Sequence, residues 1–419
     1  MSYILIIRIF VSMTGPLSSP VPPGERIQAL DLLRGVAVLG ILIMNIQHFS
    51  MPVAAYINPA AYGDLTGTNR WVWILSHILA SGKFMSIFSM LFGAGILLFS
   101  DRAGIKGMNP TRLHYRRMAW LLLFGLMHAY LLWTGDILVS YSLCGMLVFL
   151  FRGQPPKAQV RMAIAFFMVP ILWDLLSVWS MAYWPQETVR FAMESWAPGE
   201  AVIKHQLQVY RSGWLDQMEL RVPGSLFMQT RYFLMRPFWR VTSLMLLGMA
   251  LYRQDVLTGT RSTGFYTRLA LFGLVGGYTL SGLGVYLNFR HGWTLEYSMF
   301  LGVQFNYVGS VFAALGYVGV VMLINQTGGL NRAKKGLTAV GRMAFSNYIL
   351  MTLICTFLFY GHGLGLFGKV ERTFQALMVA GIWILILIFS SLWLRRLKMG
   401  PLEALWRRLT YGSWPPLKK

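Results

Sequence analysis

Apolar residues along the chain group into ten segments of helical length, separated by polar stretches rich in Gly and Pro. Most of them exceed the roughly 17 residues that an α-helix needs to cross a bilayer. The segments are about 30–48, 80–100, 116–134, 136–151, 161–184, 232–252, 265–288, 298–325, 338–361 and 374–398. The pattern therefore predicts an all-α, polytopic membrane protein with about ten transmembrane helices.

The first segment carries a stripe of polar side chains along an apolar helix. At 100° per residue, four polar positions fall within an arc of about 100°: Asp31, Arg34, Asn45 and His48. A rise of about 1.5 Å per residue separates Arg34 from Asn45 by roughly 16 Å, so the stripe places a cation near one membrane surface and an amide and an imidazole near the other. This arrangement suits a reaction that crosses the bilayer. The alternative is that Asp31 and Arg34, three residues apart, only neutralise each other.

Composition agrees with the segment pattern. Hydrophobic residues make up 56% of the 419 and charged residues 12%, which excludes an ordinary soluble protein. A formal charge of +22 would suggest nucleic-acid binding in a soluble chain. Here the basic residues are spread over separate loops, most of them on the side of the N-terminus, so the charge sets topology and the nucleic-acid function is excluded. By the positive-inside rule both termini are cytoplasmic, and the lipid bilayer is the expected partner.

Five parts follow along the chain: an N-terminal arm (1–29), an N-terminal helical half (30–184), an outer loop (185–231), a C-terminal helical half (232–398) and a cytoplasmic interfacial tail (399–419). Residues 1–12 are apolar but too short to span, and Met13 is as good a start as Met1. The outer loop is too large for a mere connector and is expected to cap the outer face. Cys144 and Cys355 sit inside apolar runs with no CxxC partner, which argues against a disulfide or a metal site.

The opening segment also resembles a known family. The motif comprises Arg26, Leu30, Asp31, Arg34, Gly35, Met44 and Asn45. It looks like the start of the YeiB-like family of bacterial inner-membrane proteins, domain of unknown function 418. Two later phrases are similar to that family's C-terminal signature: Gly341, Arg342, Ser346, Asn347 and Tyr348, then Gly400, Pro401, Leu402, Glu403, Trp406 and Arg407. The resemblance implies a multi-pass protein of the bacterial cytoplasmic (inner) membrane.

The same opening is similar to that of the heparan-alpha-glucosaminide N-acetyltransferases and, more loosely, of the acyltransferase-3 membrane proteins. The acyltransferase-3 motif has an Arg, ten residues and then a His, and Asn45 stands at that His position here. The resemblance implies a transmembrane acyltransferase-like bundle. Such an enzyme moves an acyl group from a cytoplasmic donor, acetyl-CoA or another acyl-CoA, to an outward-facing glycan, lipid or other small-molecule acceptor.

Four residues are the catalytic candidates. His77 occupies the place of the acetyltransferases' catalytic His, between the first two spans, where an imidazole can accept a proton from an acceptor hydroxyl or amine. Asn45 could orient that imidazole or donate to the developing oxyanion. His128 and Asp136 belong to a phrase, GLMHAYLLWTGDILVSY, that looks like one of the YeiB-like family. The structural alternatives are an interfacial His77 and a His128 that bonds to Tyr130 or Tyr141 inside the bundle.

A basic cluster at the cytoplasmic mouth of the third segment is the candidate donor site. The residues expected to bind the CoA donor are Asp31, Arg34, Arg112, Arg116 and Arg117, with the basic ones holding its phosphates. The alternative is a topology signal that also contacts anionic lipid, because any positive-inside loop has this composition.

Two other classes of function remain open. Buried His, Asp and Arg also fit a transporter or channel for a small polar solute, although no convincing internal repeat supports it. A non-catalytic membrane scaffold is the third possibility. The sequence allows a homodimer.

Overall fold

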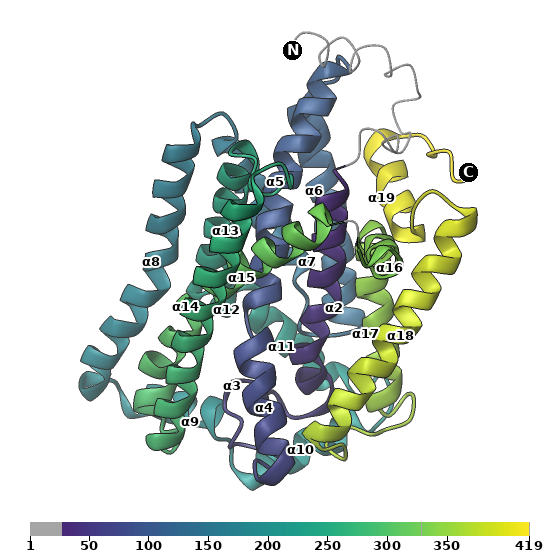
Figure 1. Cartoon of the computed structure of the whole chain (residues 1–419). Coiled ribbons are helices and arrows are strands. Elements are labelled where there is room, and N and C mark those ends of the chain that lie inside the picture. Colours follow the sequence, from purple (N-terminus) through teal and green to yellow (C-terminus); the bar gives the residue numbers. More distant parts are fainter. Residues whose placement is uncertain (1–26, 328, 419) are drawn as a thin grey trace.

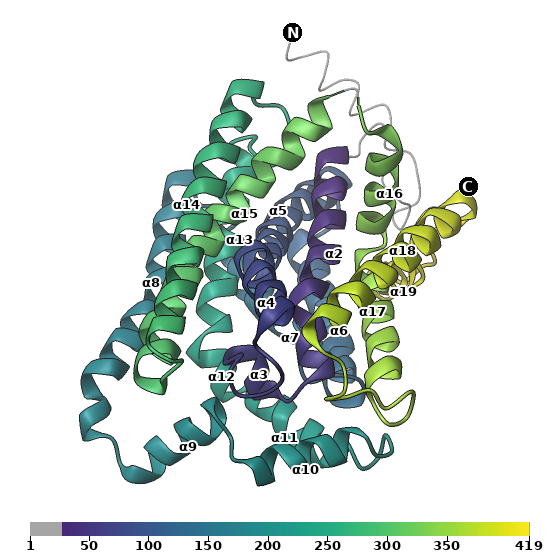
Figure 2. The ribbon, with the colours of Figure 1, turned by 60° about the horizontal axis from the view of Figure 1, so that its bottom comes forward.

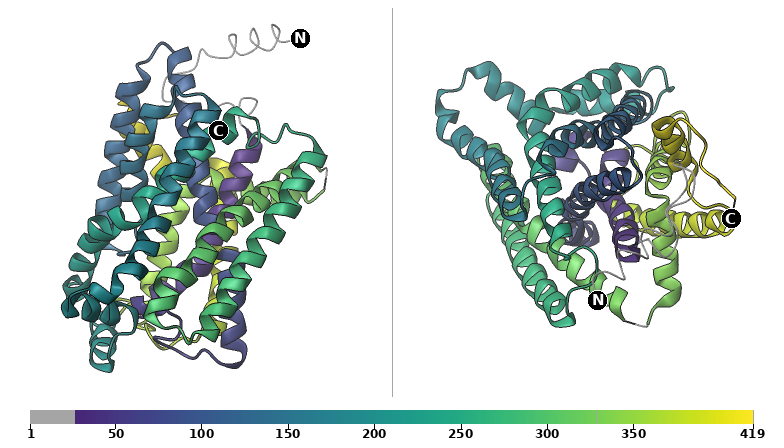
Figure 3. Two further views of the ribbon diagram at one scale, coloured as in Figure 1. Left: turned by 90° about the vertical axis from the view of Figure 1, so that its left-hand side faces the viewer. Right: turned by 90° about the horizontal axis from the view of Figure 1, so that it is seen from above.

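The computed structural model describes residues 27–327 and 329–418, which form an all-helical bundle (Figure 1). Two ends of this bundle can be told apart. The start of α2, the turn between α5 and α6, and helix α19 lie at one end, called here the α19 end; α3, α9 and α10 lie at the opposite end, called the α10 end (Figures 1 and 3). Most of the N-terminal arm, including Met1 and Met13, lies outside the described residues.

The N-terminal half forms seven α-helices. They are α2 (Gln28–Ser50), α3 (Val53–Ile57), α4 (Gly67–Ala80), α5 (Lys83–Ile105), α6 (Pro110–Leu131), α7 (Leu138–Val148) and α8 (Pro156–Ser180), with short 3-10 turns η2 (Phe149–Phe151) and η3 (Met181–Tyr183). Asn109 caps α6 by accepting a hydrogen bond from the Arg112 backbone N–H, and a Pro opens that helix.

The outer loop and the C-terminal half contribute the remaining helices. The outer loop folds into α9 (Gln186–Trp196), α10 (Glu200–Tyr210), α11 (Met218–Gln229) and α12 (Arg231–Met235). Helices α9 and α10 run across the α10 end of the bundle in Figure 2, as the expected cap would. The C-terminal half forms α13 (Pro237–Arg253), α14 (Thr263–Arg290), the π-helical η4 (Leu295–Gly302), α15 (Val303–Gln326), α16 (Asn331–Arg342), α17 (Ala344–Phe359), α18 (Arg372–Arg396) and α19 (Pro401–Tyr411).

The ten predicted segments are helical over most of their length, although 232–252 is divided between α12 and α13 and 338–361 between α16 and α17. Fewer of them are long and apolar enough to cross a membrane. Among the described residues six elements pass that test: α2, α4 with α5, α8, α14, η4 with α15, and α18. A seventh follows if α16 and α17, which meet at an angle of 85°, count as one span. Helix α7 has only 11 residues, so it rises about 16 Å and cannot cross a hydrocarbon core of about 30 Å alone. About six candidate spans are therefore shown, and the expected number of about ten transmembrane helices stays a prediction.

Three outer helices of the bundle expose an apolar surface. Large apolar side chains are exposed on α8, α14 and α18, such as Trp179, Phe272 and Leu377. In water such surface would be unfavourable, whereas in a bilayer it meets apolar chains. The described residues thus form a multi-pass membrane bundle.

Close packing of α2 against α16 positions one end of this bundle. A Cβ on Gly35 would lie 2.0 Å from the Leu337 carbonyl oxygen, and one on Gly341 would lie 1.9 Å from the Asp31 carbonyl oxygen. The two backbones therefore touch at this crossing, which only glycine permits. Because Arg34 and Arg342 each neighbour one of these glycines, the crossing sets both cations at the α19 end.

Candidate active site

A cavity of about 380 Å³ opens at the α19 end, between α2, α5, α6, α7, α16, α17 and α19. Its volume lies in the range of about 300–1,000 Å³ typical of small-molecule sites. The charged residues of its wall are strongly unbalanced. The basic ones are Arg34, Arg102, Lys106, Arg117, Arg342, Lys398 and Arg407, and the acidic ones are Asp31 and Glu403. This excess of cations would attract an anionic ligand.

The predicted donor-binding residues are only partly brought together. Asp31, Arg34 and Arg117 line the cavity, whereas Arg112 and Arg116 are exposed and do not. The sequence could not separate Arg116 from Arg117, because only the helix face decides which side chain points inward. It also missed the contribution of α16 and α19, which lie far along the chain.

Asp31 and Arg34 form the ion pair that the sequence allowed. Arg34 donates to the Asp31 carboxylate at 2.7 Å. The Arg34 side chain is 30% exposed and the Asp31 side chain 17% exposed. The pair therefore faces the cavity without being sealed from it. One of the wall cations is thereby already neutralised.

Glu403 fastens α19 to the start of α17. Its carboxylate accepts hydrogen bonds from the Phe345 N–H at 2.8 Å, from the Ser346 N–H at 3.1 Å and from the Ser346 hydroxyl at 2.5 Å. Burial raises the pKa of Glu403, and these hydrogen bonds oppose that shift. A negative charge at the N-terminus of α17 is also favoured by the helix dipole.

Arg117 also lies beside α19, at the mouth of the cavity. Its guanidinium lies 4.3 Å from the centre of the Trp406 ring, and the Trp406 indole N–H donates to the Arg117 carbonyl at 2.9 Å. Such cation–π contacts fix a guanidinium without neutralising its charge. Arg117 therefore remains a cation that a ligand in the cavity can meet.

Further inside, the cavity wall becomes apolar. Val38, Leu91 and Leu121 line it, together with Leu138 and Tyr348. The cavity thus combines a cationic mouth with an apolar interior, a form suited to a ligand with an anionic end and an apolar end.

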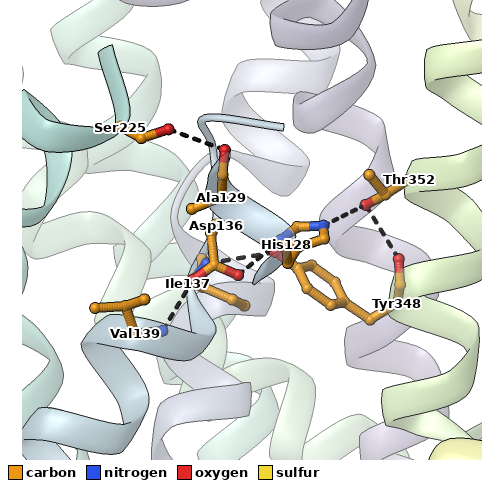
Figure 4. Close-up of polar contacts among 8 residues, drawn as sticks. All are labelled: His128, Ala129, Asp136, Ile137, Val139, Ser225, Tyr348 and Thr352. Atoms are coloured by element: carbon orange, nitrogen blue, oxygen red, sulfur yellow. Dashed lines mark hydrogen bonds and ion pairs between the residues drawn. The ribbon is translucent and has the colours of Figure 1, made fainter. Parts of the chain in front are cut away.

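Behind this wall lies a buried acid–base pair (Figure 4). The Nδ1 atom of His128 is 2.7 Å from Asp136 Oδ2, and both side chains are 1% exposed. Thr352 Oγ1, from α17, lies 3.0 Å from His128 Nε2. An ionised carboxylate only accepts hydrogen bonds, so Nδ1 is the donor in this pair. The Thr352 hydroxyl also donates to the Tyr348 carbonyl at 3.3 Å, and it becomes a donor to Nε2 only when its single proton turns from that carbonyl to the imidazole.

Local chain geometry explains why His128 and Asp136 meet. His128 lies in the last turn of α6, and Asp136 precedes α7, where its Oδ1 accepts the Val139 N–H at 2.9 Å. The tight turn between the two helices folds Asp136 back onto the imidazole. The two residues of the GLMHAYLLWTGDILVSY phrase are thus in contact, and within residues 27–327 and 329–418 neither Tyr130 nor Tyr141, the expected alternatives, forms a hydrogen bond with His128. Tyr141 instead contacts the Ser89 hydroxyl at 2.6 Å.

One layer of side chains separates the pair from the cavity. The Ile137 N–H donates to the Tyr348 hydroxyl at 3.3 Å, and both residues line the cavity. The ring of Tyr348 lies 5.0 Å from that of His128. A rotation of Tyr348 would therefore connect the imidazole with the cavity.

His77 and Asn45 lie elsewhere. His77 is half-buried on α4, where its ring stacks on Trp73 at 4.9 Å. Asn45 is half-buried on α2. No hydrogen bond or ring contact within residues 27–327 and 329–418 joins either side chain to His128 or Asp136. The four catalytic candidates therefore form no single constellation: two of them are paired and two stand apart.

A second polar centre was not predicted as a site. Lys83 is fully buried, and its Nζ donates to the His77 carbonyl and the Ser281 hydroxyl, both at 3.0 Å, and to Asn306 Oδ1 at 2.5 Å. Arg240 is 7% exposed and donates to the hydroxyls of Ser86 and Ser310 at 3.0 and 2.7 Å, and to the Tyr307 carbonyl at 3.1 Å.

No carboxylate in the described part of the chain forms an ion pair with either cation of this centre. Buried cations with only neutral partners are costly in a membrane bundle and mark functional positions. The signal that could have found them was present, since a Lys and an Arg interrupt otherwise apolar segments.

Comparison with known proteins places the chain in a family. The chain is 33% identical to the uncharacterized protein YeiB of Escherichia coli over 404 aligned residues. This alignment covers 94% of this chain and 98% of that protein. The chain belongs to the YeiB-like family. It is also 32% identical to the uncharacterized protein YxaH of Bacillus subtilis, over 96% of this chain and 98% of that protein. The family model described as protein of unknown function DUF418 matches residues 251–413. In this YeiB-like chain that match includes α16, α17 and α19, which supply one side of the cavity.

Proposed function

We propose that this YeiB-like protein is a membrane-bound acyltransferase that moves an acyl group, in the first instance acetyl, from a cytoplasmic CoA thioester to an outward-facing envelope glycan or lipid. The observation that carries the proposal is the cavity: a cationic mouth, an apolar interior and a buried His128–Asp136 pair lie in sequence from the α19 end inward. The resemblance of the opening motif to the acetyltransferases points to the same chemistry.

The α19 end is the cytoplasmic end in this proposal. The positive-inside rule assigns the basic loops and both termini to that side. The donor then enters from the compartment that holds CoA, its phosphates meet Arg117 and Arg342, and its pantetheine arm follows the apolar wall. In this proposal the protein lies in the bacterial inner membrane, and α9 and α10 are outside.

His128 would serve as the base. The acceptor hydroxyl attacks the thioester carbonyl, Nε2 of His128 takes the hydroxyl proton, and Asp136 stabilises the imidazolium that forms. The attack forms the carbon–oxygen bond of the ester. Collapse of the tetrahedral intermediate then restores the carbonyl and breaks the carbon–sulfur bond, and the imidazolium returns its proton to the departing thiolate. For this step Tyr348 has to move off the imidazole, and Thr352 has to release Nε2.

Comparative mass spectrometry of envelope glycans and lipids tests the reaction. Cells with and without the protein are compared, and the expected result is an acyl-sized mass difference that the unsubstituted chain restores. Unchanged masses in cells that express the protein at normal level would overturn the proposal.

Donor binding is tested by thermal unfolding of the purified protein with CoA. At a hundred times the dissociation constant, CoA should stabilise the protein by about 2.7 kcal/mol. Arg117→Gln should weaken this effect because Arg117 lines the cavity, whereas Arg116→Gln, which changes an exposed neighbour outside it, should not. No stabilisation of the unsubstituted protein by CoA would contradict the assigned donor site.

The orientation is tested separately by reporter fusions. Fusions at Gly63 and Gly199 should report the outer compartment, and fusions at Gly107 and Gly336 the cytoplasm. A reversal at any of these positions would place the cavity mouth on the wrong side for a CoA donor.

A transporter for a small polar solute is the second candidate, and the centre at Lys83 and Arg240 favours it. Two buried cations held by neutral oxygens could be transiently occupied by an anion that crosses the bundle. In that case Lys83→Met would impair uptake of an intact anion into proteoliposomes, and His128→Ala would leave it unchanged.

A further inference from the structure

A second, smaller pocket lies on the other side of α2 from the basic cavity's apolar interior. It has a volume of about 180 Å³ and is bounded by the last turns of α2, by α4 and by the first turns of α18. A single water needs only about 10–15 Å³ of comparable space, so the pocket can hold a small molecule. Helices α4 and α18 flank α2 on the near side of the molecule in Figure 1.

Three residues that line this pocket each have a buried polar atom with no hydrogen-bond partner among the described residues. The atoms are Gln47 Oε1, Gln375 Oε1 and Arg372 Nε, and their side chains belong to residues that are 3%, 1% and 1% exposed respectively. Buried polar groups are nearly always paired, because leaving them unpaired destabilises the folded state. Three such atoms around one pocket indicate a ligand that supplies both donors and acceptors.

Two of these residues use their other polar groups within the protein. The amide nitrogen of Gln375 donates to the Val370 carbonyl at 2.9 Å. The terminal nitrogens of Arg372 donate to the carbonyl oxygens of Asp64, Pro59 and Tyr62. The two amide oxygens therefore remain as acceptors, and Arg372 Nε and the amide nitrogen of Gln47 remain as donors. Hydroxyl groups fit all of these atoms, because each hydroxyl both donates and accepts.

The rest of the wall is apolar except for Ser76. Ile46 and Val379 contribute aliphatic surface, and the indole N–H of Trp383 donates to the Leu39 carbonyl at 2.9 Å, which fixes the Trp383 ring in the wall. An aromatic face beside hydrogen-bonding groups suits a ligand with an apolar face and a polar edge. Ala376 and Ala380 are exposed, so the pocket can be reached from outside between α4 and α18.

We propose that this pocket binds a neutral hydroxylated ring, such as a sugar or a cyclitol. Its hydroxyls pair with Gln47, Gln375 and Arg372, and its C–H face lies against Trp383. The ring comes either from a free molecule or from the headgroup of a glycolipid. This inference does not depend on the proposed acyl transfer, because the pocket shares no lining residue with the basic cavity.

The test uses the full chain in phosphatidylcholine nanodiscs, prepared without sugar detergents. One arm adds glucose or myo-inositol, and the other arm adds monoglucosyl diacylglycerol to the discs; thermal unfolding and ligand-detected NMR report binding. If glucose or myo-inositol binds and stabilises the protein, the ligand is a free ring. If only the glycolipid does so, the ligand is a lipid headgroup. Cyclohexanecarboxylate, an anionic ring, should not bind.

Matched variants locate the binding. Gln375→Leu should weaken binding about tenfold, the loss typical of one hydrogen bond with an unpaired partner. Gln159→Leu is the control, since Gln159 in α8 is also buried, also has an unpartnered Oε1 and also donates from its amide nitrogen to a backbone carbonyl, but lines neither pocket. Gln47→Leu, on a different helix, replaces Gln375→Leu if that variant does not fold.

Two results would overturn the inference: absence of binding in both arms, or binding that both Gln375→Leu and Gln47→Leu leave unchanged. Neither result bears on CoA binding, which is measured at the other end of the bundle.

Discussion

At His128 a buried imidazole meets a carboxylate, whereas at Lys83 and Arg240 two buried cations meet only carbonyl, hydroxyl and amide oxygens. Both centres are shielded from solvent, so the difference is one of charge balance. In the first centre, ionised Asp136 and the imidazole N–H stabilise each other. In the second, hydrogen bonds are made but the charge is not neutralised. The same kind of substitution should therefore have opposite effects on stability in the two centres.

The largest expected effect is on catalysis. His128→Ala should lower acyl transfer by about a hundred- to ten-thousandfold, the usual contribution of a general base. His77→Ala should leave most of the activity, because His77 stacks on Trp73 away from the His128–Asp136 pair. Product formation in membranes, followed by mass spectrometry, measures both. If His77→Ala were inactive and His128→Ala active, His77 would be the base, and the His128–Asp136 pair would have no catalytic role.

Asp136→Asn should have the largest effect on stability. Asparagine removes the charge that holds the imidazole N–H, so the free energy of unfolding should fall by about 2 kcal/mol, as expected for a hydrogen bond to a charged group. Asp216→Asn is the matched control: Asp216 accepts a backbone N–H, from Gly213, but is exposed. Denaturant unfolding in mild detergent measures both variants. Equal losses of unfolding free energy in the two variants would mean that burial of the His128–Asp136 pair adds nothing to its stabilising effect.

Lys83→Met should act in the opposite direction. Removing a buried charge without an acidic partner should raise the free energy of unfolding by about 1 kcal/mol, since the desolvation cost disappears. Ser281 and Asn306 still bond to each other, at 3.1 Å. Lys106→Met, at the half-exposed mouth of the cavity, should leave the unfolding free energy almost unchanged. A clear destabilisation by Lys83→Met would show that an anion normally neutralises this centre, which sharpens the case for transport.

The smallest effect concerns the second contact of the imidazole. Thr352→Val keeps the shape of the side chain and removes the hydroxyl that lies 3.0 Å from His128 Nε2, so the protein should lose about 1 kcal/mol of stability. Acyl transfer should survive, because the hydroxyl must leave Nε2 before that atom can act as a base. A Thr352→Val variant as inactive as His128→Ala would instead place Thr352 in the reaction.

Much of the architecture could be predicted from the periodicity of the chain. Ten apolar segments, the polar stripe of the first one and the turn after His128 all depend on residues close together in sequence, and each corresponds to a helix or a contact in the bundle. The pairing of His128 with Asp136 belongs to this class, because a tight turn brings neighbours in sequence together. The ion pair of Asp31 with Arg34 is set by helical spacing alone.

What the sequence by itself determined is thus local: an all-helical membrane protein, its apolar segments, and pairs of polar residues one or two turns apart. Only the tertiary structure decided that Arg117 faces a cavity while Arg116 faces outward, and that α16 and α19 complete that cavity. It also decided that Thr352 reaches His128, across 224 positions of the chain, and that Lys83 and Arg240 share one buried centre. The physical reason is that helix periodicity fixes which residues share a face, whereas the choice of neighbouring helix depends on packing between distant segments, such as the contact of Gly35 with α16.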